Sequence, residues 1–321
     1  MKAAVLVEKE KFEVRDFPMP EADDNSVLVK MEACAVCNAT DTKLYKGTHA
    51  FAAYPSIIGH EGVGVVEKVG KNVTKLKVGD RILGGSFYCA DIPSLWGAYT
   101  QYGTADENAI VVPETVKPEE ASLAFMLSEA VNAVRIGDIK ADDNILIIGA
   151  GAVGFSLLSI LKNTLHLNVI VADLVDEKLE IASKMGADAV INTKKEDIAQ
   201  RIHEVTDGKG INKIFEAVGS KNTYQMAFDL AAHGAVIVPF GLIEGTMEIP
   251  FRTLYAKEIQ IKWCKGSGVH DLENKKIAVS LIKSGLIDTD ALITSRVPFE
   301  NVSEAFAKIA QGNEIRVVLQ M

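Results

Sequence analysis

The chain contains little cysteine, no cluster of basic residues and no long apolar run. Its four cysteines among 321 residues are too few for a disulfide framework. No apolar stretch approaches the roughly 20 residues that a membrane-spanning helix needs. The net charge of −9, without a basic tract, argues against nucleic acid and anionic membranes as partners. Glu8 follows the N-terminus too soon for a signal peptide. These absences favour a cytoplasmic protein.

One stretch has the spacing of a dinucleotide-binding turn. A short apolar run at 145–148 predicts a buried strand, and three glycines at G-x-G-x-x-G spacing follow it. Residues 153–165 then predict a helix, and 168–172 a second buried strand. In such a unit the glycines allow a tight turn, close approach of the backbone to a pyrophosphate, and close packing of the helix on the strand. We therefore expect a dinucleotide to contact Gly149, Gly151, Ala152, Val153 and Gly154.

The residue that ends the second strand bears on the choice of coenzyme. Asp173 can accept hydrogen bonds from ribose hydroxyls, and its charge would repel a 2′-phosphate. The residues after it, 174–176, supply no Arg or Lys to hold that phosphate. The sequence therefore favours NAD over NADP. Val218 and Gly241 follow later strands at the same predicted sheet edge, where we expect contact with the nicotinamide half.

The pattern of elements changes along the chain. Residues 1–112 predict short strands and turns, whereas strands and helices alternate from Asn144 onward, which indicates a parallel, doubly wound sheet. The further strands expected in that sheet are 189–191, 213–216, 235–239 and 258–262. The helices expected after the first are 176–185, 195–206, 221–232, 251–256, 275–284 and 302–311. A last strand at 315–319 is assigned to the first domain.

A second group of residues has the chemistry of a metal site. Cys37, His60 and Glu61 offer thiolate, imidazole and carboxylate donors, the set that zinc takes at catalytic sites. Each residue alone is weak evidence, because a buried Cys is more often a small core residue and a lone His is usually structural. Their joint occurrence ahead of a dinucleotide-binding unit strengthens the metal hypothesis.

Five stretches carry a family resemblance: 35–41 around Cys37, 59–66, 78–81, 149–154 and 315–319. With them the chain resembles the zinc-dependent medium-chain dehydrogenase/reductase family, the alcohol and polyol dehydrogenases, over nearly its whole length. The resemblance implies an α/β fold with a GroES-like, partly open β-barrel catalytic domain at 1–129 and 267–321. It implies a doubly wound parallel (Rossmann) NAD-binding domain at 130–266, and a homo-oligomer, dimer or tetramer, formed through the edge strand near 258–262.

The implied activity is hydride transfer between a secondary alcohol or polyol and NAD. Cys37 and His60 would bind one catalytic zinc, with Glu61 as ligand or near ligand, and zinc would stabilise the alkoxide. The partner is then a small alcohol or ketone, whose identity depends on loops 43–56 and 84–100.

Thr40 is expected to relay the proton of the alcohol. The family commonly has Ser or Thr two residues after the cysteine, but this chain has Ala39 there and Thr40 one residue later. Asp41 or His49 could share the relay. Alternatively, the Thr40 hydroxyl only bonds its own backbone in a turn.

Two departures from the family pattern concern metal. Phe125 occupies the usual position of a third zinc ligand, so Glu129 could be recruited, Glu61 could complete the shell, or the site could lack zinc. Glu129 could also contact the nicotinamide or simply pack. Many members bind a structural zinc through four closely spaced cysteines, but 84–97 contains only Cys89, so we expect no structural zinc.

Two alternative functions stay open. A zinc-free, NAD(P)H-dependent enone or quinone reductase of the same superfamily is favoured by Phe125 and opposed by Asp173 and the metal donors. A non-catalytic NAD-binding protein is the alternative of another class.

Overall fold

The computed structural model describes residues 1–89, 92–165, 167–243, 245–266 and 268–321. Residues 90 and 91 of the predicted substrate loop, and residue 267 at a predicted domain boundary, lie outside the described residues. The chain forms two compact units, Met1–Ala124 with Thr289–Met321, and Phe125–Asp288. None of the described helices combines the length and apolar character needed to cross a bilayer.

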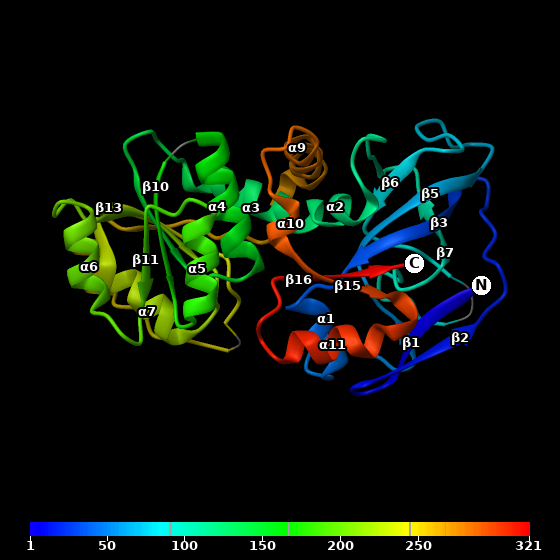
Figure 1. Ribbon diagram of the computed structural model, residues 1–321, viewed down its shortest axis with the longest axis horizontal. Helices are drawn as coiled ribbons and strands as arrows, with labels where there is room; N and C mark the ends of the chain where they lie inside the picture. Colours follow the sequence, from blue (N-terminus) through cyan, green and yellow to red (C-terminus); the bar gives the residue numbers. More distant parts are fainter. Residues whose placement is uncertain (90–91, 166, 244, 267) are drawn as a thin grey trace. The chain divides into compact units, whose positions relative to one another are not determined.

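The first unit is built from two sheets (Figure 1). The larger has the order β15-β16-β3-β5-β6-β8, with β7 beside β3, and the smaller has the order β2-β1-β4. Its strands are β1 (Lys2–Glu8), β2 (Lys11–Asp16), β3 (Ser26–Ala35), β4 (Ser56–Ile57), β5 (Glu61–Val69), β6 (Arg81–Gly84), β7 (Tyr102–Asp106), β8 (Ile110–Val111), β15 (Ile293–Pro298) and β16 (Arg316–Gln320). Its helices are α1 (Thr40–Tyr45), α2 (Pro118–Ser122), α10 (Thr289–Leu292), α11 (Val302–Ala310) and the 3-10 turn η2 (Phe299–Asn301).

One apolar core joins the two ends of the chain in this unit. Side chains from β1, β3 and β5 pack with Phe299, Phe306 and Leu319 from the C-terminal segment. The antiparallel pairing of β16 with β3 places Val318 opposite Ala35, and Figure 1 shows the red β16 beside the blue β3. The last strand therefore belongs to the larger sheet of the first unit.

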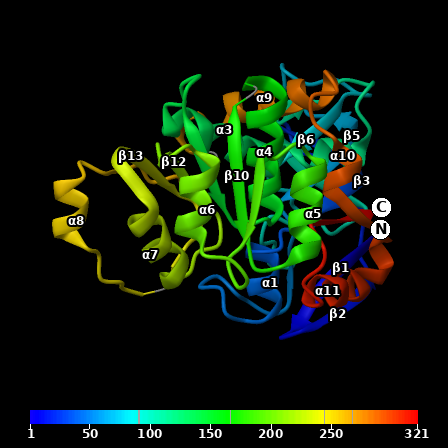
Figure 2. The same ribbon diagram turned by 60° about the vertical axis from the view of Figure 1, so that its left-hand side comes forward.

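The second unit is a parallel sheet with the order β11-β10-β9-β12-β13-β14. Figure 2 shows helices packed around it, with α8 at its β13 end. Its strands are β9 (Asn144–Ile148), β10 (Asn168–Asp173), β11 (Ala189–Asn192), β12 (Ile211–Glu216), β13 (Ala231–Pro239) and β14 (Gln260–Ile261). Its helices are α3 (Ala124–Gly137), α4 (Ala152–Leu165), α5 (Asp176–Lys184), α6 (Ile198–Val205), α7 (Lys221–Leu230), α8 (Phe251–Ala256), α9 (Asp271–Lys283) and the 3-10 turn η1 (Gly268–His270). The predicted doubly wound sheet is confirmed.

Several elements differ from the expected ones. The helix expected at 195–206 begins at Ile198, because the Asp197 carboxylate caps it by accepting from the N–H groups of Ala199 and Gln200. The edge strand expected at 258–262 contains only Gln260 and Ile261. Helix α1 and strand β15 were not expected. Both are short, and their sequences lack a strong apolar period.

The two units also differ from the predicted domains at their boundaries. Arg135 of α3 donates to Asn274 of α9 at 2.9 Å, and the Lys275 ammonium lies 4.4 Å from the centre of the Phe125 ring. These contacts attach α9 to α3, and both helices lie in the second unit. The boundaries at 129/130 and 266/267 stay a prediction.

Gly151 and Gly154 differ in how tightly the protein packs around them. A Cβ on Gly154 would lie 1.9 Å from the Gly149 carbonyl oxygen, whereas a Cβ on Gly151 would meet nothing within 4 Å. We expect Gly154→Ala to lower the free energy of unfolding by about 1–3 kcal/mol through overpacking. Gly151→Ala, the matched control, should unfold at the wild-type urea midpoint. Equal midpoints for both variants would contradict the close packing of α4 on β9.

Candidate metal centre and dinucleotide site

Strand register brings the predicted metal donors together at one end of the larger sheet. Ala35 of β3 lies opposite Glu61 of β5. Cys37 follows β3 and His60 precedes β5, so both leave the ladder at the same end. The ligand atoms of Cys37, His60 and Glu61 all lie within 4.8 Å of one another.

The chemistry of this cluster fits a divalent cation. The Oε2 atom of Glu61 is buried without a hydrogen-bond partner among the described residues, a costly state that a cation would relieve. The His60 Nε2 atom lies 3.8 Å from the Glu61 Oε1 atom. One thiolate, one imidazole and one carboxylate match the ligands that zinc takes in open catalytic sites.

Asp41 contacts two of the metal-donor residues, Cys37 and His60, and orients them. Its buried carboxylate accepts from the Cys37 backbone N–H at 3.0 Å and from the Tyr99 hydroxyl at 2.7 Å. The Nδ1 atom of His60 lies 3.3 Å from the Asp41 Oδ1 atom. A carboxylate on Nδ1 leaves Nε2 to face the other donors, as in carboxylate–histidine–metal arrangements. The sequence analysis considered Asp41 only for the proton relay.

Arg316 is a site residue that the sequence analysis did not single out. Its guanidinium donates to the Glu61 Oε1 atom at 2.9 Å and to the Val36 carbonyl at 2.8 Å. Both side chains of the ion pair are almost fully buried. A lone arginine within the apolar run at 315–319 was the available signal, because a buried cation requires a partner.

The buried charges shift one another's protonation. Burial opposes ionisation of Cys37, but the hydrogen bond and charge of His60 outweigh it and lower the pKa of the thiol to about 7. Burial also opposes the charge on His60, while Asp41 and Cys37 raise the pKa of its imidazole well above the ordinary value. Burial raises the pKa of Glu61 to about 8, against the effect of Arg316. A bound cation would displace protons from these donors.

Three other residues predicted for this site, Thr40, His49 and Glu129, make hydrogen bonds that do not test their predicted roles. The Thr40 backbone N–H donates to the Cys37 sulfur at 3.4 Å, so Thr40 begins α1 directly beside the cluster. The His49 Nδ1 atom accepts from the Phe51 N–H at 3.1 Å. Glu129 belongs to α3, where its backbone carbonyl lies 4.0 Å from the Cys264 sulfur. The roles proposed for these three residues stay predictions.

The glycine turn joins β9 to α4 with the expected geometry. Gly149 has a φ of 107°, which favours glycine, and its N–H donates to the Ala172 carbonyl at 2.8 Å. The Asp173 Oδ2 atom accepts from the Ala150 N–H at 2.7 Å, and its Oδ1 atom accepts from the N–H of Leu174. The Oδ1 atom also accepts from the Val175 N–H at 3.0 Å. Asp173 thus braces the turn, and its Oδ2 atom keeps one lone pair for a ribose hydroxyl. Ala152, Val153 and Gly154 form the first turn of α4.

Glu216 holds the two loops predicted to contact the nicotinamide half. This buried residue ends β12, and its carboxylate accepts from the N–H groups of Val218 and Gly219 at 3.0 and 2.9 Å. Its backbone carbonyl accepts from Phe240 and from Gly241 at 2.8 and 3.0 Å. Burial raises the pKa of Glu216 against these donors. Glu216 was expected to end a strand, whereas the contact with the cofactor was expected at Val218 and Gly241.

Known proteins match the chain over both units. Residues 23–116 match the family model described as an alcohol dehydrogenase GroES-like domain, and residues 152–284 match the model described as a zinc-binding dehydrogenase. The D-arabitol-phosphate dehydrogenase of Enterococcus avium is 31% identical, over 95% of this chain and 92% of its own. An alcohol dehydrogenase of Geobacillus stearothermophilus is 30% identical, over 100% of both chains.

A solved structure supports the same comparison. The short chain alcohol dehydrogenase of Escherichia coli CFT073, complexed with NADH, is 25% identical and has a TM-score of 0.90 over 100% of this chain and 99% of its own. The predicted fold class, a GroES-like domain with a Rossmann domain, is confirmed by these matches.

The hydroxyl of Tyr99 should contribute more to stability than that of a second buried tyrosine. Tyr99 donates to the Asp41 carboxylate at 2.7 Å, whereas Tyr224 donates to the Gly241 carbonyl at 2.6 Å. Hydrogen bonds to charged groups contribute about 1.5–3 kcal/mol, and those between neutral groups about 0.5–1.5 kcal/mol. Urea unfolding should therefore show a larger loss for Tyr99→Phe than for Tyr224→Phe. A smaller loss for Tyr99→Phe would mean that Asp41 does not depend on this donor.

Proposed function

This chain belongs to the zinc-dependent medium-chain dehydrogenase family, and from that premise we propose that it transfers a hydride between a secondary alcohol or polyol and NAD. The observation that carries the proposal is the cluster of Cys37, His60 and Glu61, in which the buried Glu61 Oε2 atom has no hydrogen-bond partner among the described residues. The names of the relatives support an alcohol or polyol as the substrate class.

Three residues of the first unit would hold a single zinc. Cys37 and His60 supply two donors, and Glu61 supplies the third, in place of the ligand that Phe125 replaces. Glu129 is the alternative third donor. Zinc, when bound, supplies Lewis-acid stabilisation of negative charge on the substrate oxygen. Asp41 would keep the His60 Nε2 atom facing the other metal donors. Thr40 would relay the proton of the alcohol, with its hydroxyl passing its own proton on to solvent as it takes up that of the alcohol. No structural zinc is proposed, because Cys89 is buried alone among the described residues 84–89 and 92–97.

The second unit would bind NAD at the carboxyl edge of its parallel sheet. The pyrophosphate would lie on Gly151, Ala152, Val153 and Gly154 at the start of α4, whose N–H groups and dipole favour negative charge. Asp173 would accept from the ribose and repel a 2′-phosphate, which favours NAD over NADP. Glu216 would fix Val218 and Gly241 against the nicotinamide half.

One observation favours a second candidate function. By the family's usual spacing, Phe125 stands at the position of a metal ligand, where its side chain supplies no metal donor. Its ring lies under the Lys275 ammonium. A zinc-free enone or quinone reductase would need no metal donor. A non-catalytic NAD-binding protein would also tolerate the loss.

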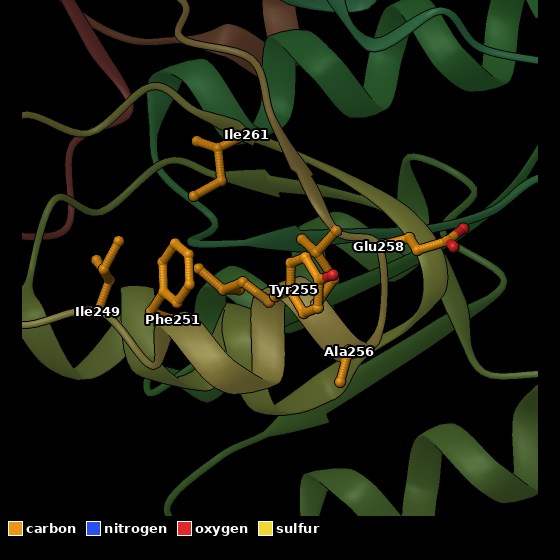
Figure 3. Close-up of a pocket in the computed structure, with 8 residues that line it drawn as sticks. Ile249, Phe251, Tyr255, Ala256, Glu258 and Ile261 are labelled. Carbon is orange, nitrogen blue, oxygen red and sulfur yellow. The ribbon is translucent and has the colours of Figure 1, made fainter.

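The open edge of the parallel sheet supports a homodimer. β14 ends the sheet, and beside it lies a groove of about 730 Å³ lined by Ile249, Phe251, Tyr255 and Ile261 (Figure 3). Phe251 and Tyr255 of α8 are 72% and 77% exposed. Exposed apolar side chains beside an open sheet edge favour association with a second chain. Antiparallel pairing of two copies about Gln260 would bring Glu258, which precedes β14 with a φ of 54°, near the partner's Lys262, because the two charges lie symmetrically about Gln260.

The metal hypothesis is tested by zinc content per chain in protein purified without chelator. The wild type should contain one zinc, and Cys37→Ser, His60→Ala and Glu61→Gln should each lose it while retaining NADH binding. Glu129→Gln is the matched control and should keep zinc if Glu61 is the third donor. The zinc-loaded wild type should oxidise secondary alcohols with a higher kcat/KM for NAD than for NADP.

The outcomes separate the candidate functions. Zinc lost from Glu129→Gln but kept by Glu61→Gln would transfer the third ligand to Glu129. No zinc with turnover of enones and NADPH would support the zinc-free reductase. NADH binding without turnover of alcohols or enones would support the non-catalytic protein.

The dimer hypothesis is tested by charge reversal at the sheet edge. Lys262→Glu places a like charge near Glu258 in both symmetry-related positions, and we expect the dissociation constant to rise about tenfold. Glu258→Lys should act alike, and the double swap should restore dimerisation because it restores both pairs. Analytical ultracentrifugation measures all four proteins. A monomeric wild type, or a double swap no tighter than the single variants, would exclude this register.

A further inference from the structure

A short segment of the first unit lies directly against the residues that lead into His60. The Leu95 N–H donates to the Ile57 carbonyl at 2.8 Å, and the N–H groups of Ala98 and Tyr99 donate to Gly59 and Ile58 at 2.9 and 3.0 Å. Trp96 and Gly97 lie between these bonds. The segment is therefore fixed to the backbone that positions the metal donor.

Trp96 has an unusual backbone conformation for its size. Both Trp96 and Gly97 have a φ of 67°, in the left-handed region that favours glycine. Gly97 has an evident reason, since a Cβ there would lie 2.0 Å from the Ser94 Oγ atom. No such reason requires tryptophan at position 96, where glycine would adopt the same φ without strain. A bulky residue held in a strained conformation is a ground for a functional hypothesis.

The left-handed backbone of Trp96 places its indole ring against His60, one of the three metal-donor residues. The ring centres of Trp96 and His60 lie 5.1 Å apart, with the planes tilted by 58°. The indole is half-buried, and it therefore presents apolar surface beside a histidine that also lies near the Asp41 and Glu61 carboxylates. Apart from one N–H donor, the indole recognises carbon skeleton, not charge.

We propose that Trp96 is a specificity-determining residue that forms an apolar wall of the substrate site and limits the group on the reacting carbon to a small one. This inference rests on the proposed function, because the wall has meaning only for an alcohol bound at the cluster. The substrate class is then a secondary alcohol with one small apolar substituent. An aromatic wall excludes larger groups by volume, and removal of volume from a pocket relaxes such exclusion by roughly 10-fold or more.

The experiment compares kcat/KM for 2-propanol and 1-phenylethanol with NAD. Trp96→Gly removes the indole and suits the left-handed φ, so the segment should keep its fold. We expect the ratio of 1-phenylethanol to 2-propanol to rise at least tenfold, with a smaller rise in Trp96→Phe. Leu95→Ala is the matched control, because Leu95 packs on the same core as Trp96, whereas the ring contact with His60 is made by Trp96. Its ratio should equal that of the wild type.

A second readout does not depend on turnover. The chain has two tryptophans, so Trp263→Phe leaves Trp96 as the single emitter. Co²⁺ added to the metal-free variant should quench this emission, because Trp96 adjoins the proposed ligands. Zinc content should be unchanged in Trp96→Gly.

Three results would overturn the inference. An unchanged ratio in Trp96→Gly, with alcohol turnover intact, would overturn it alone. Loss of zinc with an equal fall in kcat/KM for both alcohols would show that the indole only positions His60. Failure of the wild type to oxidise either alcohol would overturn the proposed function and the wall together, while Co²⁺ quenching would still report the metal site.

Discussion

The arrangement of the metal donors depends on one buried carboxylate. Asp41 accepts from the Cys37 backbone N–H and the Tyr99 hydroxyl, and its Oδ1 atom lies 3.3 Å from the Nδ1 atom of His60. Its partners come from the turn after β3, from the segment that ends in Tyr99, and from the start of β5. A buried charge must be satisfied from several directions, so Asp41 forces these three segments to converge. Without that demand, the strand register alone would bring Cys37 and His60 near each other but would not orient them.

The charges around Asp41 explain why a cation suits this place. Asp41, Glu61 and Cys37 can each carry a negative charge, whereas His60 and Arg316 are the cations beside them. Arg316 donates to the Oε1 atom of Glu61, and the Oε2 atom is buried without a hydrogen-bond partner among the described residues. The protein therefore buries metal-donor atoms that the neighbouring side chains do not fully satisfy with hydrogen bonds. Such an excess lowers stability in the absence of a ligand and is typical of sites that bind one.

Sequence analysis identified the features that depend on local chain geometry. The spacing of Gly149, Gly151 and Gly154 indicates a turn because left-handed φ and close helix packing are properties of a few adjacent residues. Cys37, His60 and Glu61 were recognised by donor chemistry, but their convergence depends on the β3–β5 register. Arg316 contacts Glu61 across a long sequence separation. Glu216 accepts hydrogen bonds from the loops that follow β12 and β13. Trp96 was placed within the loop 84–100, on which the identity of the substrate was expected to depend, but its conformation was not predicted. Its φ follows from tertiary hydrogen bonds that no local pattern reports.

The return of β16 to β3 sets an order of events during synthesis. Arg316 leaves the ribosome 255 residues after Glu61, its ion-pair partner. The second unit is contiguous, from Phe125 to Asp288, so all of it is available to fold before that partner appears. Throughout this interval the Glu61 carboxyl lacks its guanidinium, and the larger sheet lacks two strands. The nascent first unit therefore exposes the edge of β3, and the last strand to be made both closes that edge and neutralises the site.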